Sequence, residues 1–272
     1  IDIVELKRKN LLRDGDAITT GQIIPVASAR DCMDAALARA GWAQRSYATA
    51  APHLRRGYGV STICFGVGYG DGYPDGSRAR VRFDDEGTLE VYSGAVEVGQ
   101  GVHALLAHIA GEELAVPPEQ VRVIGSDTHL TPESGSSSAT RQTFFTGNAV
   151  KLAAGEVRRQ LLDAAALLSG LHWEDLELRP GVIVGRTKPV ELRLATLLPA
   201  ARARGFSLEH TSLFQPRTIP GERGTGRSPR AFVTYMFGSH VAEVIVDTNT
   251  GEVAVQRIVA AHDVGKAINP RE

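Results

Sequence analysis

The sequence predicts an α+β fold in which antiparallel hairpins pack against helices. Two hairpin patterns, with alternating apolar and polar residues on each side of a turn, occur at residues 79–93 and 241–260. Two segments with helical apolar spacing, residues 102–114 and 143–168, stand between them. Strands and helices do not alternate regularly, as they would in a doubly wound parallel sheet, so an α+β arrangement is favoured.

Each remaining segment is assigned from its own pattern. The first 24 residues are charged and contain turn residues, which predicts a leading helix and an extended link. Apolar spacing between residues 28 and 42, with Gly41 near its end, favours a short helix. The later segments are a glycine-rich stretch at 55–76, a strand at 121–124, a small hairpin at 176–184, a mixed stretch at 189–203 that ends in a basic helix-like part, and a mobile loop at 216–230.

Composition and charge exclude several classes of protein. The 272 residues are 43% apolar and 22% charged, which suits a globular protein with a sizeable core. A net charge of −1 lacks the strong basic field of a dedicated nucleic-acid binder, so no nucleic-acid partner is expected. Cys32 and Cys64 are too few for a disulfide scaffold, a four-cysteine zinc site or an iron–sulfur cluster. Their scarcity suits a reducing compartment, so we expect a cytoplasmic protein.

The apolar runs and the two ends of the sequence indicate whether it contains a membrane span or a signal peptide. No stretch approaches the ~20 consecutive apolar residues that a membrane-spanning helix needs, so no membrane partner is expected. The N-terminus has no initial Met and no apolar run of signal-peptide length, and the C-terminus directly follows an apolar, structured-looking run. We therefore expect the chain to be incomplete at both ends.

The first candidate ligand-binding element is the segment EVGQG at residues 97–101, between a predicted strand and a predicted helix. Gly99 and Gly101 would let the backbone approach a ligand closely, and the helix start offers N–H groups to an anion. The amide of Gln100 would supply both a donor and an acceptor. A tight strand-to-helix turn alone would also explain this pattern.

The second candidate element runs from Ser136 to Thr143, immediately before the long helix. Five hydroxyls, an amide and a guanidinium gather where the first backbone N–H groups of a helix have no partner. An N-cap needs only one such side chain. The density of polar groups therefore indicates phosphate or heterocycle recognition as readily as simple capping.

Other kinds of site are not indicated by the sequence. It has no Gly-x-Ser-x-Gly nucleophile motif, and Cys64 reads as a small buried hydrophobe. The eight histidines show no metal-ligand spacing, and His240 and His262 are expected to sit singly beside strands. Asp263 reads as a turn or capping residue. The residues alone thus predict no metal ligands and an α+β protein with two helix starts able to bind an anionic cofactor.

Four segments, taken in order along the chain, resemble the molybdenum hydroxylases, the xanthine dehydrogenase and aldehyde oxidase family. They are VELKRKNLL, SGAVEVGQGVHALLAHIAGEEL, SDT with SSSATRQTFFTGNAV, and HVAEVIVDTNTGEVAVQRIVAAHDVGKAINP. Together they span nearly the whole chain and match the molybdopterin-binding large subunit or domain. On this resemblance we expect residues 1–54 to form an N-terminal connecting segment, and residues 55–272 to form a molybdopterin-binding region of one or two α+β lobes.

The resemblance also implies roles for individual residues. Gln100 would be the catalytic residue of this chain, next to the oxo ligand of molybdenum, within a cofactor-binding loop that includes Gly99 and Gly101. Phe65 and Gly66 fall near the substrate-pocket residues of the family. The molybdopterin, with its phosphate, would be held by the loop before the long helix, at Ala139, Thr140, Arg141, Gln142 and Thr143.

The activity implied by the resemblance belongs to a larger enzyme. The intact protein would hydroxylate a purine, a related N-heterocycle or an aldehyde with water, and pass electrons to iron–sulfur clusters and, where present, FAD on other domains or subunits. The general base of the family, a glutamate in a later Gly-Glu-Pro-type motif, is not in this chain, so the chain alone is expected to be inactive. Surface that would pack against absent parts predicts self-association into a homo-oligomer.

Two alternatives remain open from the sequence. The chain could be a non-catalytic cofactor-binding or assembly domain with the same fold. It could also belong to a family member that acts on carbon monoxide, nicotine-like compounds or isoquinoline.

Overall fold

A computed structural model describes residues 2–270, which divide into two compact units. The first unit comprises residues 2–73 and 218–267, and the second comprises residues 74–217 and 268–270. Both candidate loops lie in the second unit, whereas Phe65 and Gly66 lie in the first. The domain boundary expected between residues 54 and 55 coincides with the start of a strand in the first unit, and it stays a prediction.

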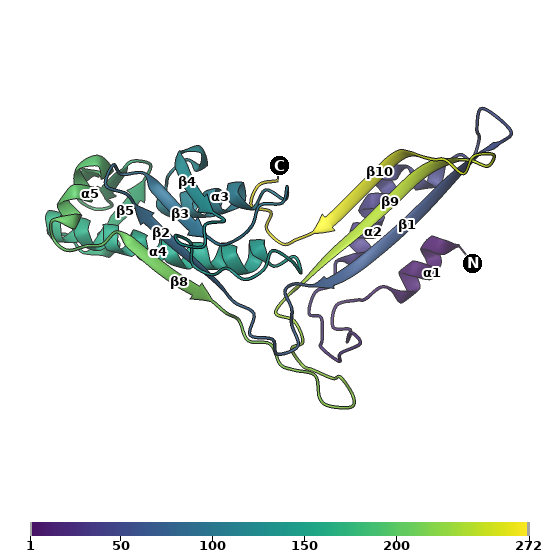
Figure 1. The fold of residues 1–272 in the computed structure, drawn as a ribbon, viewed down its shortest axis with the longest axis horizontal. Coiled ribbons are helices and arrows are strands. Elements are labelled where there is room, and N and C mark those ends of the chain that lie inside the picture. The colour runs from purple at the N-terminus through teal and green to yellow at the C-terminus, as the bar shows by residue number, and fades with distance from the viewer. Residues whose placement is uncertain (1, 271–272) are drawn as a thin grey trace. The chain divides into compact units, whose positions relative to one another are not determined.

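The first unit is built on a three-stranded antiparallel sheet (Figure 1). Its strands pair in the order β1-β9-β10, and the β1–β9 register is unbroken along both strands. A bulge near Gln256 interrupts the β9–β10 register once. The strands are β1 (Leu54–Gly66), β9 (Tyr235–Asp247) and β10 (Val253–Asp263).

Two helices accompany this sheet. Helix α1 (Ile3–Asn10) begins at Asp2, whose carboxylate accepts hydrogen bonds from Val4 N at 2.9 Å and Glu5 N at 3.1 Å. Helix α2 (Ala29–Ala40) covers one face of the sheet, and its apolar stripe packs on Val241 of β9. The short helix η1 (Trp42–Gln44) follows.

The second unit is built on a four-stranded mixed sheet in the order β4-β3-β2-β8. The pairs are antiparallel except for β3 with β4, which run parallel because a helix, α3, connects them. The elements of this sheet are β2 (Ser77–Phe83), β3 (Leu89–Ser93), α3 (Val102–Leu114), β4 (Val121–Gly125) and β8 (Glu209–Phe214). The unit also contains η2 (Pro118–Gln120), η3 (Trp173–Asp175), β5 (Leu176–Arg179), β6 (Val182–Gly185), β7 (Glu191–Arg193) and α5 (Leu194–Arg202).

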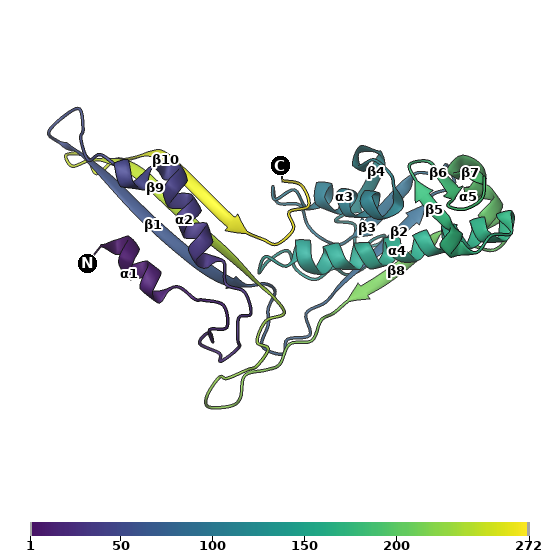
Figure 2. The ribbon, with the colours of Figure 1, turned by 180° about the vertical axis from the view of Figure 1, so that it is seen from behind.

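Helix α4 (Gln142–Ser169) lies at the centre of the core of the second unit, along the sheet and α3 (Figure 2). A Cβ at Gly147 would stand 2.9 Å from Ile109 Cδ1, so the end of the Ile109 side chain would have to shift where α3 approaches α4 closely. This close packing fixes α3 and α4 against each other. The stripe that α4 buries is made largely of small residues, which are Ala149, Ala153, Ala154, Ala164 and Ala165.

The predicted α+β fold is confirmed, with differences in detail. The helices expected at 102–114 and 143–168 and both main hairpins are present. In addition to the predicted antiparallel hairpins, the structure has one parallel pair, β3 with β4. Strands β1, β7 and β8 were not predicted, since the glycines in β1 and the shortness of β7 hide their alternation.

Two expectations about single side chains are also wrong. Cys64 is exposed rather than buried, because β1 is an edge strand and α2 packs mainly on β9 and β10. His240 and His262 do not sit singly, since their Nε2 atoms lie 2.7 Å apart across β9 and β10.

Asp263 has the contacts of a turn residue. Its carboxylate accepts hydrogen bonds from Ser28 Oγ at 2.5 Å and from Gly265 N at 2.9 Å.

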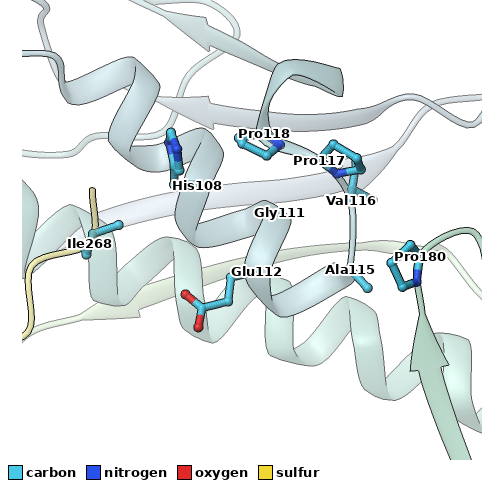
Figure 3. Close-up of a pocket in the computed structure, with 9 residues that line it drawn as sticks. All are labelled: His108, Gly111, Glu112, Ala115, Val116, Pro117, Pro118, Pro180 and Ile268. Carbon is cyan, nitrogen blue, oxygen red and sulfur yellow. The ribbon is translucent and has the colours of Figure 1, made fainter. Parts of the chain in front are cut away.

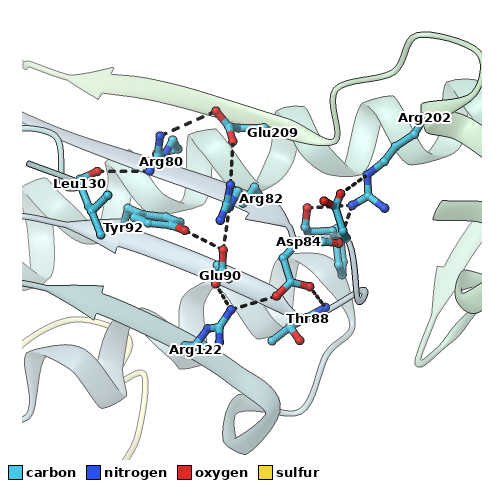
Figure 4. A network of polar contacts seen from close by, with 12 residues as sticks. Arg80, Arg82, Asp84, Thr88, Glu90, Tyr92, Arg122, Leu130, Arg202 and Glu209 are labelled. Carbon is cyan, nitrogen blue, oxygen red and sulfur yellow. Dashed lines mark hydrogen bonds and ion pairs between the residues drawn. The ribbon is translucent and has the colours of Figure 1, made fainter. Parts of the chain in front are cut away.

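The face of the four-stranded sheet turned away from α4 carries a charged network (Figure 4). Glu90 accepts hydrogen bonds from Tyr92 Oη at 2.7 Å, from Arg82 Nε at 2.6 Å and from Arg122. Burial alone would raise the pKa of Glu90, but these bonds outweigh it and leave the pKa below its ordinary value. This face of the sheet is therefore polar, and the guanidinium groups of Arg82 and Arg122 lie over the Glu90 carboxylate.

Within residues 2–270, no helix combines the length and the apolar composition required to cross a bilayer.

Candidate functional site

Residues 94–101, between β3 and α3, form a turn that is closed by its own side chains. The Glu97 carboxylate accepts hydrogen bonds from Gly101 N at 2.9 Å, Gly99 N at 2.8 Å and His103 N at 3.3 Å. These bonds, that from Gly101 foremost, hold the pKa of Glu97 below its ordinary value. Glu97 thus occupies the N–H of His103 at the start of α3, where the sequence predicted N–H groups open to an anion.

Gln100 lies on the exposed tip of this turn and folds back on it. Its Oε1 accepts a hydrogen bond from Val98 N at 2.7 Å, and its Nε2 donates to Val96 O at 2.9 Å. Gly99 and Gly101 have φ values of 103° and 75°, a region that favours glycine. The amide is therefore held in place, and it must exchange these bonds to contact a ligand.

The serine-rich loop before α4 is bonded directly to the turn that carries Gln100. Ser134 Oγ accepts a hydrogen bond from Gly94 N at 2.9 Å, and Ser137 Oγ accepts one from Val96 N at 2.9 Å. Ser137 Oγ also donates to Val96 O at 3.2 Å, the same carbonyl that Gln100 uses. The two loops singled out in the sequence, about 40 residues apart, thus form one continuous structure.

Arg141 holds this loop from the inside. Its Nε donates to Asp75 Oδ1 at 2.7 Å, and Nη2 lies 2.7 Å from the same oxygen. Nη1 donates to Ser134 O at 2.6 Å and Ser136 O at 3.2 Å, and Nη2 donates to Gly76 O at 2.6 Å. The residue is only 1% exposed. All five N–H groups of the guanidinium are therefore engaged within the chain.

Gln142 is likewise engaged internally. Its Nε2 donates to Ser136 O at 3.0 Å, and its Oε1 accepts a hydrogen bond from Thr146 Oγ1. Thr146 Oγ1 in turn lies 2.6 Å from Ser77 Oγ on β2. These contacts attach the first turn of α4 to the sheet, so Gln142 and Arg141 shape the loop rather than present their side chains outward.

At the start of α4, the side chain of the N-cap residue, Arg141, makes no capping hydrogen bond to the helix. Ala139 and Thr140 precede it with φ values of 50° and 52°, a strained conformation for residues other than glycine. Thr140 and Thr143 are exposed beside it. The start of this 28-residue helix, where the first backbone N–H groups have no partner within the helix, thus lies beside two exposed hydroxyls.

This arrangement fits an anionic group such as a phosphate. Helix starts attract anions through their N–H groups and the helix dipole, and hydroxyls add further donors. Among the described residues, no group of three or more His, Cys, Asp or Glu side chains is placed to hold a metal ion. The donors available are thus those suited to the anionic part of a cofactor.

A separate pocket of about 360 Å³ lies beside the C-terminal half of α3 (Figure 3). It is lined mainly by apolar and proline side chains, with His108 and Glu112 at its edge. It includes no residue of either candidate loop, so it is distinct from the site at the start of α4.

Sequence reasoning missed the residues that hold the two loops together. Glu97, Ser134 and Asp75 act through contacts that are distant in sequence or local to a turn, and no motif marks them. For Glu97 a signal was available, since an acidic residue shortly before a helix often caps it. Phe65 and Gly66 end β1 in the other unit, where the ring of Phe232 covers Gly66.

Replacing Glu97 by glutamine should lower the thermal midpoint at neutral pH. The folded-state pKa of Glu97 lies below the ordinary 4.5, so its stabilisation is present above that value and is lost as pH falls through the lowered pKa. The difference between Glu97→Gln and wild type should therefore shrink as the pH falls below 4.5. Thermal unfolding across this range, with Glu119→Gln as an exposed control, checks the prediction. A difference that stays constant with pH would contradict it.

Almost the whole length of the chain is similar to part of each of two longer curated proteins. It is 30% identical to the xanthine dehydrogenase molybdenum-binding subunit of Escherichia coli O157:H7, over 99% of this chain and 35% of that protein. It is also 30% identical to an aldehyde oxidoreductase of Megalodesulfovibrio gigas, over 99% of this chain and 27% of that protein. The chain thus spans about a third of the length of these curated relatives.

Solved structures share the fold. An aldehyde oxidoreductase from Desulfovibrio desulfuricans superimposes with a TM-score of 0.74 at 25% identity, over 99% of this chain and 27% of that one. Reconstituted CO dehydrogenase from Oligotropha carboxidovorans gives a TM-score of 0.76 at 20% identity, over 99% and 35%. The family model described as a molybdopterin cofactor-binding domain matches residues 35–271. The chain therefore belongs to the family of molybdopterin cofactor-binding domains.

Proposed function

We propose that this chain forms one side of the molybdopterin site of a molybdenum hydroxylase. The observation that carries the proposal is the start of α4, where Thr140 and Thr143 are exposed and whose preceding loop is bonded through Ser134 and Ser137 to the turn bearing Gln100. An anion bound at the start of α4 would lie on the same continuous structure as the Gln100 amide. Membership of the cofactor-binding family supplies the identity of that anion.

The residues at the start of α4 would contribute in three ways. The exposed hydroxyls of Thr140 and Thr143, with backbone N–H groups at the helix start, would bind the phosphate of the cofactor. Ala139 would bring its backbone close to the pterin, in its positive-φ conformation. Arg141 and Gln142 would act by holding the loop in shape, because their side chains are engaged internally.

Gln100 would act at the metal end of the cofactor, with Gly99 and Gly101 shaping its turn. Its Nε2–H groups can donate to an oxo ligand once the bond to Val96 O is exchanged. When bound, the cofactor supplies two-electron oxidation and reduction at molybdenum. Phe65 and Gly66, in the first unit, are proposed to contribute to the substrate pocket.

The enzyme that contains this chain would hydroxylate a purine, a related N-heterocycle or an aldehyde with water. The names of the two curated relatives, a xanthine dehydrogenase subunit and an aldehyde oxidoreductase, support this substrate range. Iron–sulfur and flavin domains or subunits would accept the electrons, and we propose a cytoplasmic location.

Metal analysis and dye reduction on the complete enzyme test this function. Wild-type enzyme should contain molybdenum and reduce a redox dye with at least one of xanthine, another N-heterocycle or an aldehyde, and dye reduction with carbon monoxide alone would contradict the proposed substrate range. Gln100→Ala should keep most of the molybdenum and lose at least about tenfold in turnover, because one positioned donor is removed. An active preparation without molybdenum would contradict the proposal.

A further inference from the structure

The hydroxyl of Ser137 lies at the junction of the two candidate loops. It accepts a hydrogen bond from Val96 N at 2.9 Å and donates one to Val96 O at 3.2 Å. It also accepts a hydrogen bond at 3.3 Å from Nε2 of Gln142, the first residue of α4. A hydroxyl has one proton and two lone pairs, so these three bonds use its full capacity. Ser137 therefore joins the start of α4 to both backbone groups of Val96.

The Val96 carbonyl is also where the Gln100 amide rests. Gln100 Nε2 donates to Val96 O at 2.9 Å, so this oxygen accepts two hydrogen bonds, one from each loop. When Gln100 turns away from this carbonyl, the Ser137 hydroxyl remains bonded to it. A ligand that covers the turn displaces water from it, and a polar group left there without a partner is costly. The second donor, Ser137, therefore makes the release of Gln100 easier.

The backbone on both sides of Gln100 is held independently of its side chain. Glu97 Oε1 accepts hydrogen bonds from Gly99 N at 2.8 Å and Gly101 N at 2.9 Å. The Gln100 side chain can thus change partners while its turn keeps its shape. The other bond of this side chain comes from the N–H of Val98, which is 74% exposed, so water can replace it. The Val96 carbonyl is therefore the point at which the loop before α4 acts on Gln100.

We propose that Ser137 is a positioning residue for Gln100, which fixes Val96 and retains its carbonyl when Gln100 turns towards a bound cofactor. This inference rests on the proposed function, in which Gln100 contacts the metal end of the cofactor. Without the Ser137 hydroxyl, the turning of Gln100 would leave the carbonyl without either donor. Gln100 would then stay folded back in a larger fraction of the enzyme, and turnover would fall in proportion.

Backbone hydrogen exchange in the complete enzyme, followed by mass spectrometry with fragmentation, tests the junction without using activity. In Ser137→Ala the Val96 N–H loses its acceptor, so it should exchange about tenfold faster than in wild type. Ser137→Thr keeps a hydroxyl and should exchange like wild type. Ser137→Val has nearly the shape of the threonine variant without the hydroxyl, and it should exchange like Ser137→Ala. Unchanged exchange in β2 and β3 would show that the fold is intact.

Turnover of the same variants tests whether Ser137 acts through Gln100. Ser137→Ala should lower turnover about fivefold, the equivalent of one neutral hydrogen bond, at the molybdenum content of wild type. Ser137→Thr should restore it. In a Gln100→Ala background, Ser137→Ala should cause no further loss, because the side chain that it positions is gone.

Ser207→Ala is the matched control, since it removes a bonded hydroxyl from a different loop of the second unit. Ser207 Oγ donates to Gln160 Oε1 at 3.1 Å, beside a point about 27 Å along α4 from its first residue. This variant should match wild type both in exchange at Val96 and in turnover.

Three results would overturn the proposal. They are wild-type exchange of the Val96 N–H in Ser137→Ala, loss of molybdenum from this variant, and a loss of turnover that multiplies with that of Gln100→Ala. Failure of the proposed function would instead appear without any change at Ser137, as wild type that lacks molybdenum or as Gln100→Ala with unchanged turnover.

Discussion

Replacing Arg141 by methionine should destabilise the second unit by about 3–5 kcal/mol, the cost of breaking a buried ion pair. The guanidinium is fully buried and joins Asp75, itself only 5% exposed, to carbonyls of two loop segments. Methionine would fill part of the space but leave the Asp75 carboxylate buried without its partner. It would also leave the carbonyls of Ser134 and Gly76 without donors, so the loss extends to the loop before α4.

Urea unfolding followed by Trp173 fluorescence would measure this loss, because Trp173 is the tryptophan of the second unit. A Trp42→Phe background removes the signal of the first unit. Arg159→Met is the control, since Arg159 lies on α4 with an exposed side chain and should cost less than about 1 kcal/mol. The double variant Arg141→Met/Asp75→Leu should recover part of the loss. Equal stability of Arg141→Met and Arg159→Met would contradict the assigned role.

Local patterns predicted most of the fold because the elements concerned carry their own periodicity. Helix 102–114 and the hairpins at 79–93 and 241–260 have strong apolar spacing and clear turn residues, and all are present. β1 was not predicted because glycines at 57 and 59 and an uncovered face weaken its alternation. The sequence also could not show that β1 pairs with β9, some 180 residues later.

The candidate site was predicted in location more successfully than in detail. The loops at 97–101 and 136–143 were singled out from their composition, and the structure joins them through Ser134 and Ser137. The functions of individual polar side chains could not be read from the sequence, since they depend on burial. Arg141 reads as a ligand contact in the sequence but is fully buried and engaged in the structure.

Replacing Thr143 by aspartate should have opposite effects on stability and on cofactor binding. A carboxylate in the first turn of α4 would complement the helix dipole, raising the stability of the cofactor-free chain by about 0.3–1 kcal/mol. The same charge would repel a bound phosphate. At about 4 Å and an effective dielectric of about 20, the repulsion is about 4 kcal/mol, roughly a thousandfold in affinity.

The molybdenum content of the complete enzyme carrying Thr143→Asp tests the central claim, that the start of α4 binds the anionic part of the cofactor. Thr143→Asn has nearly the same shape without the charge, and Thr187→Asp adds a charge at an exposed position on a different loop. Mass spectrometry of the metal should show normal molybdenum in both controls and little in Thr143→Asp, although that variant is folded. A Thr143→Asp enzyme with the molybdenum content of wild type would show that the cofactor is held elsewhere.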